Sequence, residues 1–594
     1  MTELVLDQDQ ERAVTSNAGA IVVVAGAGCG KTEIVARRIE RLLRESEDDP
    51  FRILVVSYTV KAADELQERF AARLGDLHRR VDADTIHGFA WSLVRQHGTR
   101  IGLPLEPEVI SRDEDRAELL EVWLRESGRA PLDDPRAVLA QLDLGRARGQ
   151  TAPYLDDWRA ALSAAGAVDY QAMLDRASEL VTGQWLSRHL QRLYAHVIVD
   201  EAQNLTVAQY RFLTQIVGDP STEHLHAALV GDERQSIVGF AGADLRLIGR
   251  FEAEYRAERI ELRTNYRSAR SIVDLGRVVS RDLGRPIESP QQETFLARGS
   301  IEVRACATEE SEGEEVARWI SELLSNGLNP DDLAPEEAPG VQPEQIAVLA
   351  RAASSLWAVR ESLGALGIET ASASTEEDWV ASTAAKVFIE MVAYRSAPEH
   401  LSTRRRVAEL CGTPDIAWDK LGVLLTSASD PSVAQLSDLE EVKELPDLIS
   451  AAEALPVDDA DWSDDVEQLV NAWRTFLDRT DPSERTYGNF RQHIARCQRG
   501  DSQDPGVRLL TVHKSQGREF RAVAVVACNE GQFPDFRAIS TDDIAAELRT
   551  FYVAISRPSR ALLLTRAETR RTRVGDRVTQ PSPFLLLANA EGQR

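Results

Sequence analysis

Short apolar runs alternate along the chain with longer segments in which apolar residues recur at helical spacing. The first run, Ala20 to Val24, precedes a glycine-rich turn and a helical pattern. Comparable runs occur at Ile53 to Val56, Val197 to Val199, Ala227 to Val230, Ile346 to Leu349, Val507 to Thr511, Ala522 to Ala527 and Ala561 to Thr565. Continuous apolar runs are typical of strands buried on both faces, and their alternation with helices indicates parallel sheets. The pattern therefore predicts an α/β protein with parallel sheets flanked by helices.

Two long segments interrupt this alternation. Residues 90–191 and 376–504 show helical periodicity and few strand signals, so we expect each to form a mainly α-helical insertion. The second contains an acidic stretch, Ser437 to Glu467. This stretch is either a surface helix pair with a mobile linker or an ordinary solvated face.

The overall composition is that of a globular protein. A length of 594 residues exceeds what one hydrophobic core supports and suggests about four units of roughly 150 residues. Hydrophobic residues make up 43% and charged residues 28%, and no apolar run approaches the roughly 18 residues of a membrane helix. The first residues lack the regions of a signal peptide. These features predict a cytoplasmic protein without a membrane anchor.

Cysteine spacing and charge narrow the possible partners. The five cysteines are scattered without a CxxC pair, so neither a disulfide framework nor a zinc site is indicated. A net charge of -27 disfavours a uniformly basic surface, although phosphate binding needs only local Lys and Arg. Two arginine-rich segments, Ser402 to Arg406 and Arg566 to Arg577, are either a local basic track or helix faces paired with nearby acids.

A phosphate-binding loop follows the first predicted strand. Glycines there let backbone N–H groups close on phosphates, and the next helix adds its positive N-terminus. Lys31 is expected to reach the β and γ phosphates, and the Thr32 hydroxyl to bind Mg²⁺. Cys29 is either a small loop residue or a thiol that the helix N-terminus makes reactive. The predicted ATP-binding loop comprises Ala25, Gly26, Ala27, Gly28, Cys29, Gly30, Lys31 and Thr32.

Two carboxylates end another apolar strand, in the segment VIVDEAQ. We expect Asp200 to hold Mg²⁺ and Glu201 to orient and deprotonate the attacking water. Phosphoryl transfer also needs arginines near the γ phosphate, and Arg267 and Arg557 are candidates by context. Spacing alone leaves each of them open as an ordinary surface arginine.

Taken in order, these segments resemble eight motifs of the superfamily 1A helicases of the UvrD, Rep and PcrA type, between about Leu6 and Phe584. The resemblance implies two RecA-like P-loop domains, each with a mainly α-helical insertion. Their expected ranges are 1–89 with 192–270, and 271–375 with 505–594, with insertions at 90–191 and, shortened, at 376–504. The other matching segments are LDQDQERAV, SYTVKAA, TIHGF, GDERQSIVGFAGA, LRTNYRS, TVHKSQGREF and FYVAISRP.

The resemblance also assigns roles to single residues. It makes Gln10 the reader of adenine, Tyr266 its stacking partner and Glu519 a ribose contact. Gln235, Arg267 and Arg557 fall near the γ phosphate, in a cleft between the two domains. The residues expected to contact single-stranded DNA are Tyr58, Lys61, His87, Phe240 and His513. Exposed rings suit that role because every base offers a face for stacking, whereas core packing is the alternative for Tyr58 and Phe240.

Departures from the family pattern lie mainly on the DNA side. The family's Tyr, Trp and Arg fall in a segment that here reads VGFA, and the usual hairpin aromatic aligns with Arg573 or Val574. Glu33 replaces an arginine that usually follows the phosphate loop. We therefore expect an ATP- and Mg²⁺-dependent 3′ to 5′ single-stranded DNA translocase or helicase, active in repair, replication or recombination. It should translocate better than it unwinds tailed or forked duplex, and a partner protein would supply processive unwinding.

Two other functions remain open from the sequence. One is a DNA-stimulated ATPase subunit of a larger complex, for example a phage-defence system, with little unwinding of its own. The other is a P-loop ATPase unrelated to nucleic acid. RNA as the track is also open, because stacking and backbone contacts discriminate poorly between RNA and DNA.

Overall fold

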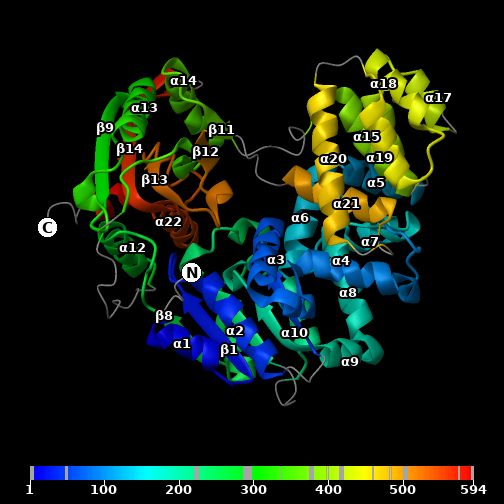
Figure 1. Cartoon of the computed structure of the whole chain (residues 1–594), viewed down its shortest axis with the longest axis horizontal. Helices are drawn as coiled ribbons and strands as arrows, with labels where there is room; N and C mark the ends of the chain where they lie inside the picture. Colours follow the sequence, from blue (N-terminus) through cyan, green and yellow to red (C-terminus); the bar gives the residue numbers. More distant parts are fainter. Residues whose placement is uncertain are drawn as a thin grey trace.

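The computed structural model describes residues 6–46, 51–219, 226–284, 297–335, 337–372, 380, 382–396, 398, 400–413, 420–457, 461–480, 482, 485–499, 506–572 and 575–589. Within these residues two parallel sheets lie on one side of the molecule and two groups of helices on the other (Figure 1). No helix in the described ranges is long and apolar enough to cross a membrane. All five cysteines are free.

The first sheet has six parallel strands in the order β3-β2-β6-β7-β1-β8. Their bounds are β1 Ala20–Ala25, β2 Arg52–Ser57, β3 Val81–Thr85, β6 Tyr194–Val199, β7 His226–Gly231 and β8 Glu258–Leu262. The order is not sequential, so crossover helices cover both faces. One face packs on α1 Gln8–Thr15, α2 Lys31–Glu45 and α3 Val60–Leu74. The other packs on α10 Val207–Val217, α11 Arg246–Tyr255 and the first helical insertion.

Side-chain alternation explains why the strands read as continuous apolar runs. In β1, Ile21 and Val23 belong to the core beneath α1 to α3, whereas Val22 belongs to the core shared with the insertion. All three are at most 2% exposed. Because successive side chains point to opposite faces and both faces are covered, every position must be apolar.

The first insertion connects β3 to β6. Its helices are α4 Ile86–His97, α5 Asp113–Glu126, α6 Pro135–Ala147, α7 Leu155–Ala164, α8 Tyr170–Thr182 and α9 Gln184–Leu193, with a two-stranded sheet of β4 Glu108–Val109 and β5 Ala167–Val168. Its apolar side chains share one core with the sheet. The insertion is therefore an extension of the first sheet's core.

The second sheet has seven strands in the order β11-β12-β10-β13-β14-β15, with β9 paired to β14. Their bounds are β9 Ser300–Thr308, β10 Ile346–Ala350, β11 Thr370–Ser372, β12 Val507–Thr511, β13 Phe520–Val525, β14 Pro558–Thr572 and β15 Gly575–Val578. One face packs on α13 Glu309–Asn326 and α14 Trp357–Ala365, and the other on α12 Arg270–Asp282, α22 Thr541–Ile555 and α23 Pro583–Asn589. Only β15 runs antiparallel, forming a hairpin with the end of β14. Arg573 and Val574, at the tip, lie outside the described residues.

The second insertion, between β11 and β12, has its own hydrophobic core. Its helices are α15 Thr383–Ser396, α16 Leu401–Leu410, α17 Leu421–Thr426, α18 Pro431–Gln435, α19 Leu445–Ala454, α20 Trp462–Arg479 and α21 Tyr487–Arg499. The acidic stretch contributes α19 and the start of α20, whose apolar sides, for example Leu448 and Trp462, are buried in that core. Residues 458–460, between α19 and α20, lie outside the described residues.

Polar contacts join the second insertion to the first, which lies directly below it in Figure 1. The Arg95 guanidinium donates to Asn489 Oδ1 at 2.9 Å, and Arg112 lies 3.4 Å from Glu409 Oε2. Arg405 pairs with Asp115 at 3.7 Å and also with Glu118.

Three arginines of the two arginine-rich segments are occupied by internal ion pairs. Arg405 is bound at the contact between the insertions, and Arg406 pairs with Glu390 at 2.9 Å. In the second segment Arg570 is buried against Glu309 and Glu312. For these three arginines the possibility of a basic track is wrong, because nearby acids already neutralise them.

The predicted fold class is confirmed. Each of the eight apolar runs lies in a parallel strand, with Ala522 to Ala527 extending two residues past β13. The sheets are flanked by helices, and each is interrupted by a mainly helical insertion.

Candidate functional site

The phosphate-binding loop runs from the end of β1, at Ala25, into α2, which begins at Lys31 with Thr32 next in its first turn. Gly28 and Gly30 have φ angles of +74° and +81°, a left-handed conformation that glycine adopts without strain. A Cβ on Gly28 would lie 2.7 Å from Asn265 Oδ1, so the segment joining the two sheets also leaves no room for a side chain.

That connecting segment is hydrogen-bonded to the loop. The Asn265 side-chain amide donates to the Ala27 carbonyl at 2.7 Å, and the Tyr266 N–H donates to the Gly28 carbonyl at 2.8 Å. The loop is therefore in direct contact with the segment that joins the two sheets.

Two carboxylates project from the end of β6, beside the loop. Glu201 Oε1 lies 3.4 Å from Lys31 Nζ. Glu201 has φ +53°, which is uncommon for a residue with a side chain and is a form of strain that clusters at functional sites. Burial, together with the neighbouring Glu201, raises the pKa of Asp200 to about 7, and Lys31 only partly offsets this. The site therefore holds more negative charge than one lysine neutralises.

A chain of hydrogen bonds runs from Glu201 to the second sheet. Gln203 donates to Glu201 Oε2 and accepts from the Asp232 N–H at 3.0 Å. Asp232 Oδ2 accepts from Gln235 Nε2 at 2.8 Å, and Gln235 Oε1 accepts from Arg557 Nη2 at 2.9 Å. All three middle residues are at most 5% exposed. The acid at one end and the arginine at the other are thus joined through a buried polar network.

Both predicted arginines lie at this junction. Arg557 follows α22 and is 3% exposed, and burial together with Arg267 lowers its pKa to about 10. Arg267 donates to the Ser556 carbonyl at 2.8 Å and lies 3.0 Å from Glu519 Oε2. Arg267 Nε is buried without a hydrogen-bond partner among the described residues. The two arginines are therefore close, and one has a donor left over for a ligand.

Gln10 and Tyr266 lie next to the same loop. Gln10 Nε2 donates to the Cys29 carbonyl at 3.2 Å, and its Oε1 accepts from the Asp7 N–H, closing a capping box at the start of α1. The Tyr266 hydroxyl donates to Asp7 Oδ2 at 2.6 Å. Asp7 thus positions both residues that were predicted to contact adenine.

Cys29 lacks the exposure and the lowered pKa of a reactive thiol, which was one of the two interpretations of its sequence position. Its side chain is buried, and desolvation raises the pKa of the thiol to about 11 despite the nearby Arg234. A protonated thiol is a poor nucleophile. Burial therefore outweighs the helix N-terminus, and Cys29 acts as a small loop residue.

The five residues predicted to contact DNA lie in four separate places. Phe240 lies on η5 Gly239–Ala241 and is 72% exposed. Its ring centre lies 5.6 Å from that of His513, which follows β12 of the second sheet. His87 on α4 faces Tyr170 at 6.1 Å, and its Nε2 is buried without a hydrogen-bond partner among the described residues. Tyr58 is half-buried against the second sheet's core. Lys61, on α3, is exposed and lies 3.9 Å from Glu65.

Sequence reasoning missed three residues that the structure places in these networks. Gln203 and Asp232 link Glu201 to Gln235, and Tyr170 faces His87. Gln203 lies in the segment VIVDEAQ and Asp232 in the segment GDERQSIVGFAGA. Polar residues directly after an apolar strand are the signal that could have identified both. Tyr170 lies in the first insertion, and nothing in the sequence connected it to His87.

A P-loop, a strand that ends in two carboxylates, Arg267 on the connecting segment and Arg557 beside β14 of the second sheet define a P-loop ATPase with two RecA-like domains. Comparison with known proteins agrees. The model of the UvrD/REP helicase N-terminal domain matches residues 6–135 and 140–256, and that of the UvrD-like helicase C-terminal domain matches residues 433–569.

Relatives match over nearly the whole chain. The ATP-dependent DNA helicase PcrA of Leuconostoc citreum is 24% identical, covering 99% of this chain and 85% of the relative. The same helicase of Staphylococcus aureus (strain Mu50) is 23% identical over 98% and 86%, and the ATP-dependent DNA helicase UvrD1 of Mycobacterium bovis is 26% identical over 95% and 82%. The chain belongs to the UvrD-like family of ATP-dependent DNA helicases.

Proposed function

We propose that this protein moves 3′ to 5′ along single-stranded DNA by hydrolysing MgATP in the cleft between its two RecA-like domains. In this proposal residues 1–89 with 192–270 form the first domain and residues 271–375 with 505–594 the second. Insertions occupy 90–191 and 376–504. The polarity rests on the family resemblance alone. Cytoplasmic location and a role in repair, replication or recombination stay predictions.

The observation that carries the proposal is the buried network from Glu201 through Gln203, Asp232 and Gln235 to Arg557. Glu201 would orient and deprotonate the attacking water, while Arg267 and Arg557 would stabilise charge on the γ phosphate. Because the network crosses from one sheet to the other, a change at the γ phosphate would alter the contact between domains. This is the coupling that a motor needs.

The charge of the site suits a divalent cation. Asp200 is buried, its pKa is raised, and a single lysine stands near the carboxylate pair. The Thr32 hydroxyl and the Asp200 carboxylate are hard oxygen ligands of the kind that Mg²⁺ prefers. We propose that these two residues would hold Mg²⁺, which would supply positive charge to offset that of the phosphates. Gln10, Tyr266 and Glu519 would hold the base and ribose.

The DNA track is assigned to the face that carries Phe240 and His513. These rings come from different domains and lie 5.6 Å apart, so a base stacked on either would sense movement between the domains. Stacking of one base contributes about 1 to 3 kcal/mol. His87 with Tyr170, Tyr58 and Lys61 would contact neighbouring nucleotides.

The direct test is ATP turnover by the purified chain with single-stranded DNA, single-stranded RNA or blunt duplex. We expect strong stimulation by single-stranded DNA, and loss of turnover in Lys31→Ala with folding retained. Translocation on DNA labelled at the 5′ end or the 3′ end would then report polarity. Turnover that ignores DNA would contradict the proposal and favour a P-loop ATPase unrelated to nucleic acid.

A second candidate is a DNA-stimulated ATPase subunit with little unwinding of its own. The observation that favours it is the β14–β15 hairpin. From Arg566 to Ser582 the sequence contains no aromatic residue that could stack on the last base pair. Comparing translocation with unwinding of tailed and forked duplex separates the two functions. Unwinding by the isolated monomer at its translocation rate would exclude this candidate and remove the need for a partner protein.

A further inference from the structure

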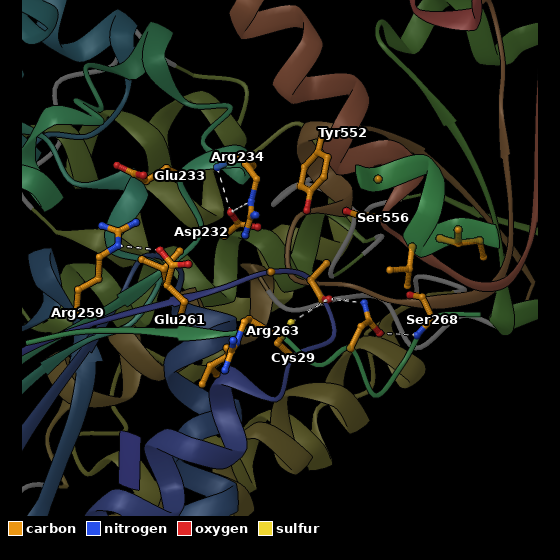
Figure 2. A pocket seen from close by; sticks show the side chains of 18 residues that line it. Cys29, Asp232, Glu233, Arg234, Arg259, Glu261, Arg263, Ser268, Tyr552 and Ser556 are labelled. Carbon is orange, nitrogen blue, oxygen red and sulfur yellow. Dashed lines mark hydrogen bonds and ion pairs between the residues drawn. The ribbon is translucent and has the colours of Figure 1, made fainter. Parts of the chain in front are cut away.

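A cavity of about 280 Å³ lies between the two domains, beside the phosphate-binding loop. Gly26, Ala27 and Cys29 form one wall, β8 and the connecting segment form the floor, and α12 and α22 close it from the second domain (Figure 2). The residues proposed to act on the phosphates, Lys31, Thr32, Glu201, Gln235 and Arg557, are not part of its described lining. The cavity is thus distinct from the nucleotide cleft, although they share the loop.

The cavity contains an unpaired polar group. Tyr552 descends from α22, is 2% exposed, and directs its hydroxyl towards the loop in Figure 2. That oxygen lies 4.0 Å from the position a Cβ on Gly26 would take, and no hydrogen bond joins it to the described residues. Burial raises the pKa of the Tyr552 phenol, so it stays a donor at physiological pH. The hydroxyl is therefore available to donate a hydrogen bond to a ligand or a water in the cavity.

The three arginines around the cavity are already paired. Arg234 lies 2.6 Å from Asp232, Arg263 lies 2.8 Å from Asp9, and Arg259 lies 3.0 Å from Glu261. A charged ligand would lose its hydration without finding a free counter-charge, which is costly. Val24, Leu262, Ile272 and Val273 add apolar residues to the lining. The paired charges therefore favour a neutral molecule with both polar and apolar parts.

The volume sets the size of that molecule. A dry cavity of about 150 Å³ holds benzene, so 280 Å³ accommodates about two fused rings. We propose that this cavity is a second ligand site, which takes a neutral planar bicyclic molecule with one hydrogen-bond acceptor facing the Tyr552 hydroxyl. The bound molecule would lie between the phosphate-binding loop and α22. It would therefore restrict movement of the second domain relative to the loop.

Binding can be followed without reference to enzymatic activity. The probe is 6-fluoroquinoline, which is neutral at about pH 8 and carries one ring nitrogen, with 2-fluoronaphthalene as the matched ligand lacking an acceptor. Fluorine NMR line widths on the full chain give both affinities. In Tyr552→Phe the affinity ratio of quinoline to naphthalene should fall about five-fold, the effect of one neutral hydrogen bond. Gly276→Leu, which adds bulk beside the Tyr552 ring, should weaken both ligands about ten-fold or more.

Three outcomes would overturn the proposal. One is failure of 6-fluoroquinoline to bind the wild-type chain. Another is displacement of the probe by a non-hydrolysable ATP analogue, which would place it in the nucleotide cleft. The third is an unchanged affinity ratio in Tyr552→Phe, a readout that remains if Gly276→Leu fails to fold. Under the proposed ATPase function the probe should lower kcat with little change in KM for ATP. The fluorine measurement stands or falls independently of that function.

Discussion

Asp200 carries the most unfavourable charge of the nucleotide site. Its pKa is raised from the ordinary 3.8 to about 7 by burial and by Glu201. The folded chain therefore binds a proton there that the unfolded chain releases, so this residue's stability contribution is full below about pH 4 and is lost as pH rises to about 7. Asp200→Asn should raise Tm by a few degrees at about pH 8 and by less at about pH 5, measured by thermal melts in the absence of nucleotide.

Asp232 provides the matched control for that experiment. It too is fully buried, but Arg234 and Lys31 more than offset the effect of burial and lower its pKa. Its contribution is present above the ordinary pKa and lost in acid, so Asp232→Asn should lower Tm at about pH 8. A lower Tm for Asp200→Asn at that pH would contradict the account of its charge.

Gln203 is expected to act by positioning Glu201, the general base of the proposed mechanism. Its amide holds Glu201 with one end and the Asp232 N–H with the other. In Gln203→Ala, Glu201 loses its fixed orientation, and kcat for ATP should fall about 10- to 100-fold with little change in KM, since small misplacements have effects of this size. Gln209→Ala removes a buried amide from the α10 capping box, away from this network. Steady-state turnover should be near normal in that control, and equal losses in both variants would indicate a general effect on folding.

At the scale of elements, the β14–β15 hairpin is held to α13 by a buried ion pair. Arg570 pairs with Glu312 and donates to Asn529 Oδ1 at 3.0 Å. Arg570→Met leaves Glu312 buried without its counter-charge, which costs about 3 to 5 kcal/mol. Arg570→Met with Glu312→Gln removes both charges while keeping an acceptor for the Thr565 hydroxyl. The double variant should recover more than half of the lost stability in urea unfolding, and additive losses would show that the pairing is unimportant.

Central strands could be predicted from the sequence because both of their faces are covered, and the strands that were missed differ in this respect. At the sheet edge, β3 reads VDADT and β8 reads ERIEL, with polar residues where a face meets solvent. In the second sheet β9 alternates between polar and apolar residues and is largely half-buried or exposed. Their pairing is decided by neighbouring strands rather than by local composition.

In the candidate site, too, some features could be predicted from the sequence and others could not. Lys31, Asp200 and Glu201 could be predicted because each lies in a local strand and turn pattern. The links through Gln203 and Asp232, the contact of Phe240 with His513, and the burial that suppresses the Cys29 thiolate depend on segments far apart in sequence. Local spacing therefore identified the chemistry, and only tertiary structure identified how the parts are connected.

For the whole molecule, the contact between the two helical insertions should depend on salt. Their cores are separate, and named ion pairs such as Arg112 with Glu409 and Arg405 with Glu118 join them across a partly exposed surface. Exposed pairs are weak and are screened over about 8 Å at physiological ionic strength. Raising salt from about 0.05 to 0.5 M should release the second insertion and increase the radius of gyration in small-angle X-ray scattering.

Charge reversal tests whether these pairs cause that change. Arg405→Glu places a carboxylate among Asp115, Glu118 and Glu409, and like charges repel most strongly at low salt. The variant should already be expanded at about 0.05 M, and added salt should change its radius less than that of the wild-type chain. Arg474→Glu on α20, outside the named contacts between the insertions, is the matched control and should follow the wild type. If all three proteins keep one radius at every salt concentration, packing rather than charge fixes the insertions.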